Sequence, residues 1–384
     1  MTREEVQSLL QRHQQALNRH DVDALTSLYV DDAVIESPMF DTVHGRDAIR
    51  RSFERLFAIF PDYTIELRDA LFIAEGNRAA EFSRVTGTQR LDLFGLSPTG
   101  QPVEYHAARL FTFTRGRIAY EQRIYDFRGV LERLEKARLD QELTVASAVQ
   151  HTLCRTHHAG AFFEIVGSSL PCRAIGGDFL EYIDLPSGAV GIAVGDVSGK
   201  GPAAALVAAM LQGMFSIVAM ESEEPRAALT RVNRALCRRG IEPRFATLAY
   251  AVLSPDGVLT YSNAGHNPSL LLTRAGVTRL TVGGPMLGVF DDAVFPQATV
   301  TLQPGDGLVA FSDGVTDAIA PDGDDFGTDR LIASAAEARS SPPSQVLAQL
   351  FSTVREFCGA VPPADDVTMA VLRFAGSGRE RPGP

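Results

Sequence analysis

Five aspartates on short turns beside apolar runs are the residues whose types and spacing best suit chemistry. They are Asp178, Asp196, Asp313, Asp365 and Asp366, and each turn also contains Gly, Ser or a second Asp. A single Asp in a turn most often shapes or caps that turn, but four such turns beside apolar runs are harder to explain in this way. Acids from several strand ends supply the oxygen ligands that hard divalent cations bind. The pattern therefore predicts a cation site, and Mg²⁺ or Mn²⁺ is favoured over Zn²⁺ because no His or Cys has zinc-site spacing.

Small and basic residues near these acids bear on the same chemistry. Gly177, Gly195 and Gly314 are neighbours of the aspartates and allow the backbone to approach an ion closely. His266 has two interpretations, a structural hydrogen-bonding residue or a catalytic one, and Lys200 either contacts a phosphate or is simply exposed on its turn. The sequence presents no arginine that is evidently placed to bind a phosphate, so metal ions are expected to hold it.

Composition and charge limit the classes of protein to consider. The chain has 384 residues, which suits two domains of ordinary size, and a net charge of −11. This charge argues against a general binder of nucleic acid or of anionic membranes. The four cysteines are isolated, the N-terminus has no apolar signal region, and we expect no stretch to approach the ~18 uncharged apolar residues of a membrane span. We therefore expect a reduced, cytoplasmic protein that binds neither nucleic acid nor membrane.

Residues 1–128 predict a small α+β domain. Apolar residues at helical spacing follow Thr2, which forms a capping-box pattern with Glu5, and two further helices cover Val22–Tyr29 and Gly45–Phe60. The strands expected after them are Thr64–Phe72, Arg78–Gln89, Pro102–Thr114 and Arg117–Phe127. Helices followed by a curved antiparallel sheet would form a cone with an internal pocket.

This order of elements resembles the SnoaL-like branch of the nuclear transport factor 2-like fold. Leu17–Val34, Gly45–Phe53, Phe60–Tyr63 and Gly116–Phe127 carry the resemblance. The scaffold hosts cyclases, isomerases and binding modules, so the resemblance implies a fold and leaves the activity open. We expect a sensory or dimerisation domain with a small hydrophobic ligand, and the candidate pocket residues are His106, Arg109, Glu121 and Asp126.

Residues 129–155 predict a connecting helix. Apolar residues recur at a mean step near 3.5 along Leu139–Leu153, which is a short coiled-coil-like stripe. The helix either packs on its own domain or transmits the state of the N-terminal domain to the C-terminal one. Pairing of this stripe, or of the N-terminal sheet, would make the protein a homodimer.

Residues 156–375 predict an α/β sandwich, in which helices flank two central sheets. Eight strands are expected, with helices at Ala203–Met220, Pro225–Gly240 and Pro343–Phe357. Tyr250–Asn263 reads as a hairpin because Ser254–Gly257 supplies the turn residues between two β-prone runs. Residues 376–384 are expected to be a disordered tail.

This second domain resembles the PPM-type protein serine phosphatases, in particular the SpoIIE/RsbU branch. The motifs that carry the resemblance are Gly176–Phe179, Gly195–Gly201, Phe245–Thr247, Ser262–Pro268, Gly283–Phe290, Phe311–Asp317 and Asp365–Thr368. It implies two Mg²⁺ or Mn²⁺ ions that activate a water and hold the phosphate. It also implies that Asp196 bridges the ions, that the Val197 carbonyl binds one of them, and that Asp178, Asp313 and Asp365 complete the ligand set. Asp196 and Asp178 are then the catalytic residues, and the choice between Asp365 and Asp366 stays open.

The resemblance further implies a phosphoserine protein as substrate, an anti-sigma-factor antagonist. Two alternatives remain at this point. The chain could be a degenerate phosphatase that binds a partner without turnover, although its complete acidic set argues against this. The N-terminal cone could instead be an enzyme of the cyclase or isomerase kind, which would make the protein bifunctional.

Overall fold

The computed structural model describes residues 1–67, 73–240 and 245–376, and these residues form two compact units, Met1–Leu143 and Thr144–Pro384. The division falls inside the predicted connecting helix. The end of the expected strand Thr64–Phe72 and all but the first residue of the expected tail lie outside the described residues.

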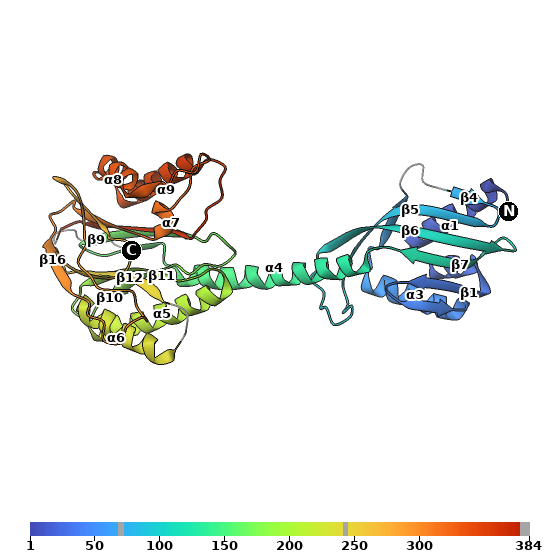
Figure 1. Ribbon diagram of the computed structural model, residues 1–384, viewed down its shortest axis with the longest axis horizontal. Coiled ribbons are helices and arrows are strands. Elements are labelled where there is room, and N and C mark those ends of the chain that lie inside the picture. Colours follow the sequence, from blue (N-terminus) through green and yellow to red (C-terminus); the bar gives the residue numbers. More distant parts are fainter. Residues whose placement is uncertain (68–72, 241–244, 377–384) are drawn as a thin grey trace. The chain divides into compact units, whose positions relative to one another are not determined.

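Three helices form one layer of the first unit (Figure 1). They are α1 (Arg3–Asn18), α2 (Val22–Ser27) and α3 (Arg46–Ile59). The predicted capping box is present, because the Thr2 side chain accepts a hydrogen bond from the Glu5 backbone and the Glu5 carboxylate accepts one from the Thr2 backbone. The apolar faces of these helices are buried against the sheet in a single core.

The sheet of the first unit has seven strands in the order β2-β1-β7-β6-β5-β3, with β4 also paired to β5. Its strands are β1 (Tyr29–Ser37), β2 (Asp41–His44), β3 (Thr64–Leu67), β4 (Ile73–Glu75), β5 (Arg78–Thr88), β6 (Pro102–Thr114) and β7 (Arg117–Ile124). All pairs are antiparallel except β1 with β7, which is parallel. Burial alternates strictly along β6, so alternate side chains face the helices.

The second unit contains two antiparallel sheets. One has the order β10-β11-β12-β13-β16 and the other β15-β14-β17-β18-β9-β8. The strands are β8 (His157–Ala159), β9 (Phe163–Leu170), β10 (Phe179–Asp184), β11 (Val190–Val197), β12 (Ala246–Leu253), β13 (Val258–Ala264), β14 (Leu270–Thr273), β15 (Gly276–Arg279), β16 (Gln297–Thr301), β17 (Gly307–Phe311) and β18 (Val367–Phe374). The predicted hairpin is β12–β13, with Gly257 at φ +88° in its turn.

Helices cover the outer faces of both sheets (Figure 1). On the first sheet lie α5 (Pro202–Glu221) and α6 (Pro225–Arg239), and α8 (Gly327–Ala338) and α9 (Pro343–Cys358) lie on the second. A third core fills the space between the sheets. The predicted fold class, an α+β chain with a C-terminal sandwich, is confirmed. In the second unit the prediction missed α8, the four-residue α7 (Asp313–Thr316) and the short strands β8, β15 and β16, and in the first unit it missed β1, β2 and β4.

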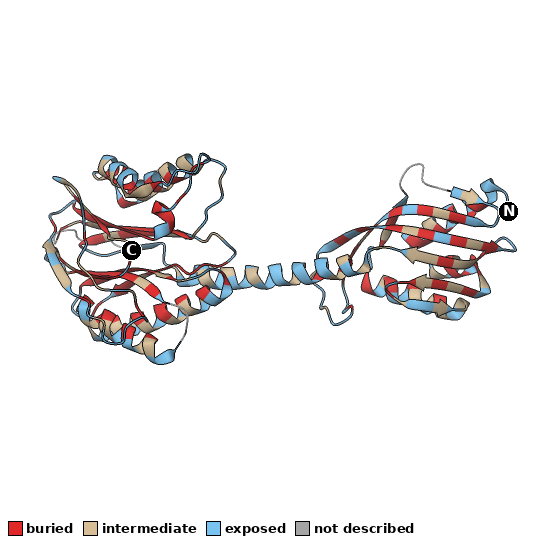
Figure 2. Ribbon diagram, in the orientation of Figure 1, coloured by how far each residue is buried: buried red, intermediate tan, exposed pale blue. Residues whose placement is uncertain are grey.

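Helix α4 (Phe127–Leu153) runs from the first unit into the second. Only Val130 and Leu134 are buried among its residues, and its second half is largely exposed (Figure 2). The exposed residues include Leu139, Val149 and Leu153 of the predicted stripe.

The sequence-based statement that no stretch resembles a membrane span is wrong for α5. This helix has 20 residues and a window of mean hydropathy 2.0, so it meets the length and composition of a span, and 39% of that window is buried. It is the one helix of this kind in the part of the chain that the structure describes. Ala204, Leu211 and Phe215 on its inner face are buried in the core against the first sheet.

Candidate functional site

The predicted acidic residues lie at one end of the sandwich, on strands of both sheets. Asp178 directly precedes β10 and Asp196 is near the end of β11, and the pairing of Phe179 with Gly195 sets them side by side. In the other sheet, Asp313 follows β17 and Asp365 precedes β18, which is paired with β17. Two pairs of neighbouring strands therefore bring together carboxylates that are far apart in the sequence.

The carboxylates repel one another. Burial, and then the charge of Asp196, raise the pKa of Asp178 well above its ordinary value. Burial, and then Asp313 and Asp365, raise the pKa of Asp196 to about 7, and burial with Asp365 raises the pKa of Asp313. Asp178 is 4% exposed, and its Oδ2 has no hydrogen-bond partner in the described part of the chain. A buried, unpaired carboxylate oxygen within a repelling cluster is the arrangement that a bound cation would stabilise.

Gly177 allows its own backbone to pack closely against the backbone segment of Asp196 and Val197. A Cβ at Gly177 would lie 2.7 Å from the carbonyl oxygen of Val197 and 3.5 Å from Asp196 Oδ1. A side chain at this position would therefore push into the segment that carries Asp196. The donor set, four carboxylates and one backbone carbonyl, fits Mg²⁺ or Mn²⁺ better than a softer metal.

Asp365 and Asp366 have different surroundings. Both oxygens of Asp366 accept backbone hydrogen bonds, Oδ1 from Cys172 N at 2.8 Å and Oδ2 from Gly177 N at 2.7 Å. Asp365 is half-buried and pairs with Lys200 Nζ at 2.9 Å through Oδ2. Asp365 Oδ1 also accepts a hydrogen bond from the backbone of its neighbour, Asp366 N, at 2.9 Å. Asp366 therefore holds the Gly177 turn in place, whereas the contacts of Asp365 are to its own turn and to Lys200.

His266 and Lys200 have defined structural contacts. His266 is buried, its Nδ1 lies 2.7 Å from the Thr247 hydroxyl, and its backbone N–H donates to Asn263 Oδ1 at 2.7 Å. Burial lowers the pKa of His266 to about 4, so the ring is neutral near pH 7. Lys200 also donates to the Ala364 carbonyl, so it links the Asp196 turn to the Asp365 turn.

Sequence reasoning missed two residues near the acids. Cys172 Sγ lies with carboxylate oxygens of Asp365 and Asp366 in a group whose atoms are within 4.8 Å of one another. Arg173 is exposed, and its Nη1 is 3.8 Å from the position that a Cβ of Gly201 would take. No ion pair joins Arg173 to the residues that the structure describes. Its position five residues before Asp178 was the only signal in the sequence.

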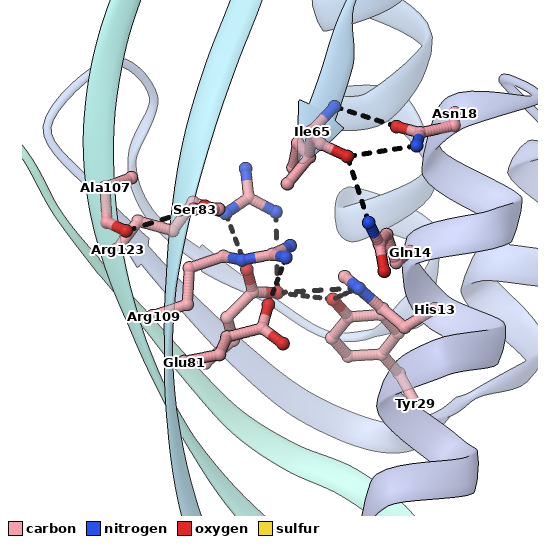
Figure 3. Close-up of polar contacts among 11 residues, drawn as sticks. His13, Gln14, Asn18, Tyr29, Ile65, Glu81, Ser83, Ala107, Arg109 and Arg123 are labelled. Atoms are coloured by element: carbon pink, nitrogen blue, oxygen red, sulfur yellow. Dashed lines mark hydrogen bonds and ion pairs between the residues drawn. The ribbon is translucent and has the colours of Figure 1, made fainter. Parts of the chain in front are cut away.

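A second polar cluster lies inside the cone of the first unit (Figure 3). Arg109 pairs with Glu81, and Arg123 Nε donates to Glu121 Oε1 at 2.7 Å. The Tyr29 hydroxyl donates to Glu121 as well, and His13 Nε2 lies 2.8 Å from that hydroxyl. The sequence pointed to Arg109 and Glu121, but it did not single out the other four members.

Burial and the neighbouring charges set the charge state of this cluster. Burial raises the pKa of Glu121, but the Arg123 and Arg109 guanidiniums and His13 outweigh it and lower the pKa to about 2. Burial raises the pKa of Glu81 and lowers that of His13 to about 3. At neutral pH the cluster therefore contains two arginine cations, a neutral histidine and at least one carboxylate anion.

His106 and Asp126 do not line the interior of the cone, but both line a separate outer pocket of about 600 Å³ between β6 and the start of α4. His106 is exposed, because it lies three residues from Arg109 on β6 and successive side chains of a strand alternate between faces. Asp126 is exposed at the start of α4, where its Oδ1 accepts a hydrogen bond from Gly129 N at 2.9 Å. An exposed helix cap is not the buried acid that a cyclase site requires.

The cavity inside the cone has a volume of about 20 Å³ and is lined by Arg109, Arg123, Tyr63, Tyr105 and Tyr125 among others. This space holds about one water molecule. Although most of its lining residues are apolar, the cavity inside the cone is too small for the small hydrophobic ligand expected from the sequence.

Comparison with known protein families identifies both units. A family described as Stage II sporulation protein E (SpoIIE) matches residues 186–375, and a SnoaL-like domain matches residues 10–121. Phosphoserine phosphatase RsbU of Bacillus subtilis is 29% identical over 204 residues, which are 52% of this chain and 59% of RsbU. Protein IcfG of Synechocystis is 28% identical over 191 residues, 42% of this chain and 30% of IcfG. The chain thus spans 30% and 59% of the length of these relatives.

Solved structures share the fold of the second unit. The SiaA-PP2C domain of Pseudomonas aeruginosa superposes with a TM-score of 0.56 at 20% identity, covering 62% of this chain and 98% of that one. The RsbU and RsbW domains of Rv1364c from Mycobacterium tuberculosis give a TM-score of 0.50 at 24% identity, covering 60% and 64%. Together, these matches show that residues 10–121 are similar to SnoaL-like domains, that residues 186–375 are similar to the SpoIIE family, and that the second unit shares the fold of PP2C domains.

Proposed function

We propose that this protein is a cytoplasmic, metal-dependent protein serine phosphatase whose substrate is a phosphoserine regulatory protein, an anti-sigma-factor antagonist. The observation that carries the proposal is the convergence of Asp178, Asp196, Asp313 and Asp365 from two sheets, with a buried, unpaired oxygen on Asp178. The similarity to RsbU, a phosphoserine phosphatase, supports the substrate class.

In this proposal the four carboxylates and the Val197 carbonyl hold two Mg²⁺ or Mn²⁺ ions. When bound, such ions supply positive charge for the phosphoryl oxygens and lower the pKa of a water molecule. Asp366 holds the Gly177 turn through two backbone hydrogen bonds, so we assign it a positioning role and assign Asp365 as the ligand.

We assign Arg173 to the binding of the substrate phosphate. Its guanidinium is exposed beside Gly201, on the turn that follows Asp196, and has no ion-pair partner among the described residues. An unpaired guanidinium can bind two phosphate oxygens at once. In this proposal Arg173 contacts the substrate phosphate from the Gly201 turn, and the metal ions contact it from the side of the carboxylates.

Regulation through α4 is supported by one pair of contacts inside the second unit. Gln150 on α4 donates to Gly176 O at 2.8 Å and accepts from Gly176 N at 3.1 Å. A Cβ at Gly176 would lie 2.2 Å from Asp366 Oδ2, so this peptide is packed directly on Asp366. A rotation of α4 would therefore displace the turn that precedes Asp178.

We also propose a homodimer in which the exposed stripe Leu139–Leu153 pairs in parallel. Leu139 and Leu153 are 46% and 45% exposed, and Val149 is 57% exposed. A pair of such helices would transmit a change in the SnoaL-like domains to both Gly176 turns. Light scattering that finds only monomer at tens of micromolar would remove this part of the proposal.

Hydrolysis of an aryl phosphate with and without Mn²⁺ tests the activity. We expect Mn²⁺-dependent turnover in the wild type and its loss in Asp196→Asn, with Asp324→Asn as an exposed control. A wild type that binds Mn²⁺ in calorimetry but hydrolyses neither the aryl phosphate nor a phosphoserine protein would instead favour a non-catalytic binder.

The contact of Gln150 has its own test. Gln150→Ala should raise the Mn²⁺ concentration needed for half-maximal binding several-fold, because the Gly176 turn is no longer held. Gln141→Ala removes an exposed glutamine from the same helix and should leave Mn²⁺ binding unchanged. Equal Mn²⁺ affinities in the two variants would show that α4 does not position the site.

A further inference from the structure

The outer face of α5 is apolar and exposed. Leu206, Ile217 and Met220 are 73%, 64% and 54% exposed, and no charged residue occurs from Pro202 to Met220. A helix on the surface of a domain normally carries charged or polar residues on its outer face. Contiguous apolar surface of this kind marks an interaction site.

The outward residues of α5 are arranged symmetrically about a glycine. Leu206, Met210, Gly213, Ile217 and Met220 follow one another at alternating steps of four and three residues, which is the spacing of a helix-pairing stripe. Met210 is half-buried and also packs against the core, and the other four residues are exposed. Large side chains stand on both sides of Gly213, and a Cβ at Gly213 would meet no atom within 4 Å. The middle of the stripe is therefore an open gap between bulky residues.

We propose that α5 pairs with α5 of a second copy of this chain, antiparallel, across a twofold axis at Gly213. An interface about a twofold axis must be self-complementary, and the stripe meets this condition. The absence of a side chain at Gly213 lets two backbones approach where the helices cross. Met210 of one copy then lies beside Ile217 of the other, and Leu206 beside Met220.

Charge selects the antiparallel direction. Glu221, Glu223 and Glu224 follow the stripe directly, and no side chain caps the N-terminus of α5 at Gly201. Glu221 and Glu224 also pair with Arg231 and Arg226 of the same chain. Antiparallel pairing sets these acids beside the partner helix's N-terminus, whose dipole is positive. Parallel pairing would instead bring the two acidic ends together.

Contacts of the inner face favour a protein partner over a lipid bilayer. The Gln212 side chain is buried and its Nε2 donates to Leu153 O at 3.1 Å, Leu180 O at 3.2 Å and Glu181 Oε2 at 2.8 Å. A helix held to the sheet in this way presents one face only, and crossing a bilayer would require these bonds to break.

Sedimentation velocity of the full chain tests the pairing, with Ile217→Glu as the disrupting variant. Its matched control is Val294→Glu, which places the same charge at a 70% exposed valine on the same unit. We expect Ile217→Glu to halve the mass of the assembly, or to raise its dissociation constant at least tenfold, while Val294→Glu keeps the wild-type mass. Unchanged melting temperatures would show that both variants fold.

A crosslink tests the position of the axis. Gly213→Cys should form a disulfide-linked dimer under mild oxidation, beyond any background from the four natural cysteines in the wild type. A monomeric wild type, an Ile217→Glu variant of unchanged mass, or no excess crosslinking of Gly213→Cys would each overturn the proposal. Flotation of the wild type with phosphatidylcholine–phosphatidylglycerol vesicles, lost in Ile217→Glu, would also overturn it and assign the face to a membrane.

Discussion

Removing the charge of Asp196 should stabilise the metal-free protein, because this carboxylate is repelled by its neighbours. Folding raises the pKa of Asp196 from 3.8 to about 7, through burial and then through Asp313 and Asp365. One pKa unit corresponds to about 1.4 kcal/mol, so the ionised group costs at most about 4 kcal/mol. Water around the partly exposed carboxylate screens some of this, and we expect Asp196→Asn to gain about 1–3 kcal/mol.

The pH dependence follows from the direction of the shift. The folded state keeps its proton to a higher pH than the unfolded state, so the cost is absent below pH 3.8, grows as the pH rises towards about 7, and is constant above it. Thermal melts in EDTA should therefore show Asp196→Asn above the wild type by roughly 2–10 °C at pH 8 and by little at pH 4. Mn²⁺ should stabilise the wild type and not the variant.

Three results would refute this reasoning. One is an Asp196→Asn variant no more stable than the wild type in EDTA at pH 8. A second is an equal gain in Asp324→Asn, an exposed aspartate of the same unit, since this would show a general charge effect. A gain that persists unchanged at pH 4 would also exclude carboxylate repulsion as its cause.

Three further perturbations separate the roles assigned above. Asp366→Ala should lower the stability of the metal-free protein by about 1–3 kcal/mol because two backbone N–H groups lose their acceptor, whereas Asp365→Ala should weaken Mn²⁺ binding in calorimetry with little loss of stability. Arg173→Ala should raise KM for a phosphoprotein several-fold and Arg173→Lys should restore part of it; an unchanged KM would contradict phosphate binding. Arg109→Met should destabilise the first unit by about 3–5 kcal/mol in denaturant melts because Glu81 is left buried without its cation, and a neutral effect would show that water replaces the guanidinium.

The sequence predicted the structural features that depend on residues close together in the chain. Apolar spacing located α5, α6 and α9, the Thr2–Glu5 pattern located the start of α1, and Ser254–Gly257 located the β12–β13 turn. Helix α8, which has 12 residues, was missed although its apolar residues recur at helical spacing. The alternation of strand faces would also have separated His106 from Arg109, since it needs only their spacing on one strand.

By itself the sequence determined which acids exist, their order and the glycines beside them. Only the tertiary structure decided how they are used, because the register of β10 with β11 and of β17 with β18 brings the carboxylates together over long sequence distances. It also decided that Asp366 accepts backbone N–H groups from the distant Cys172 and Gly177, whereas Asp365 accepts one from its neighbour Asp366 and pairs with Lys200, and that one face of α5 is left uncovered. Adjacent residues of the same type differ in role when the surrounding chain gives them different partners, and that depends on packing between elements rather than on local pattern.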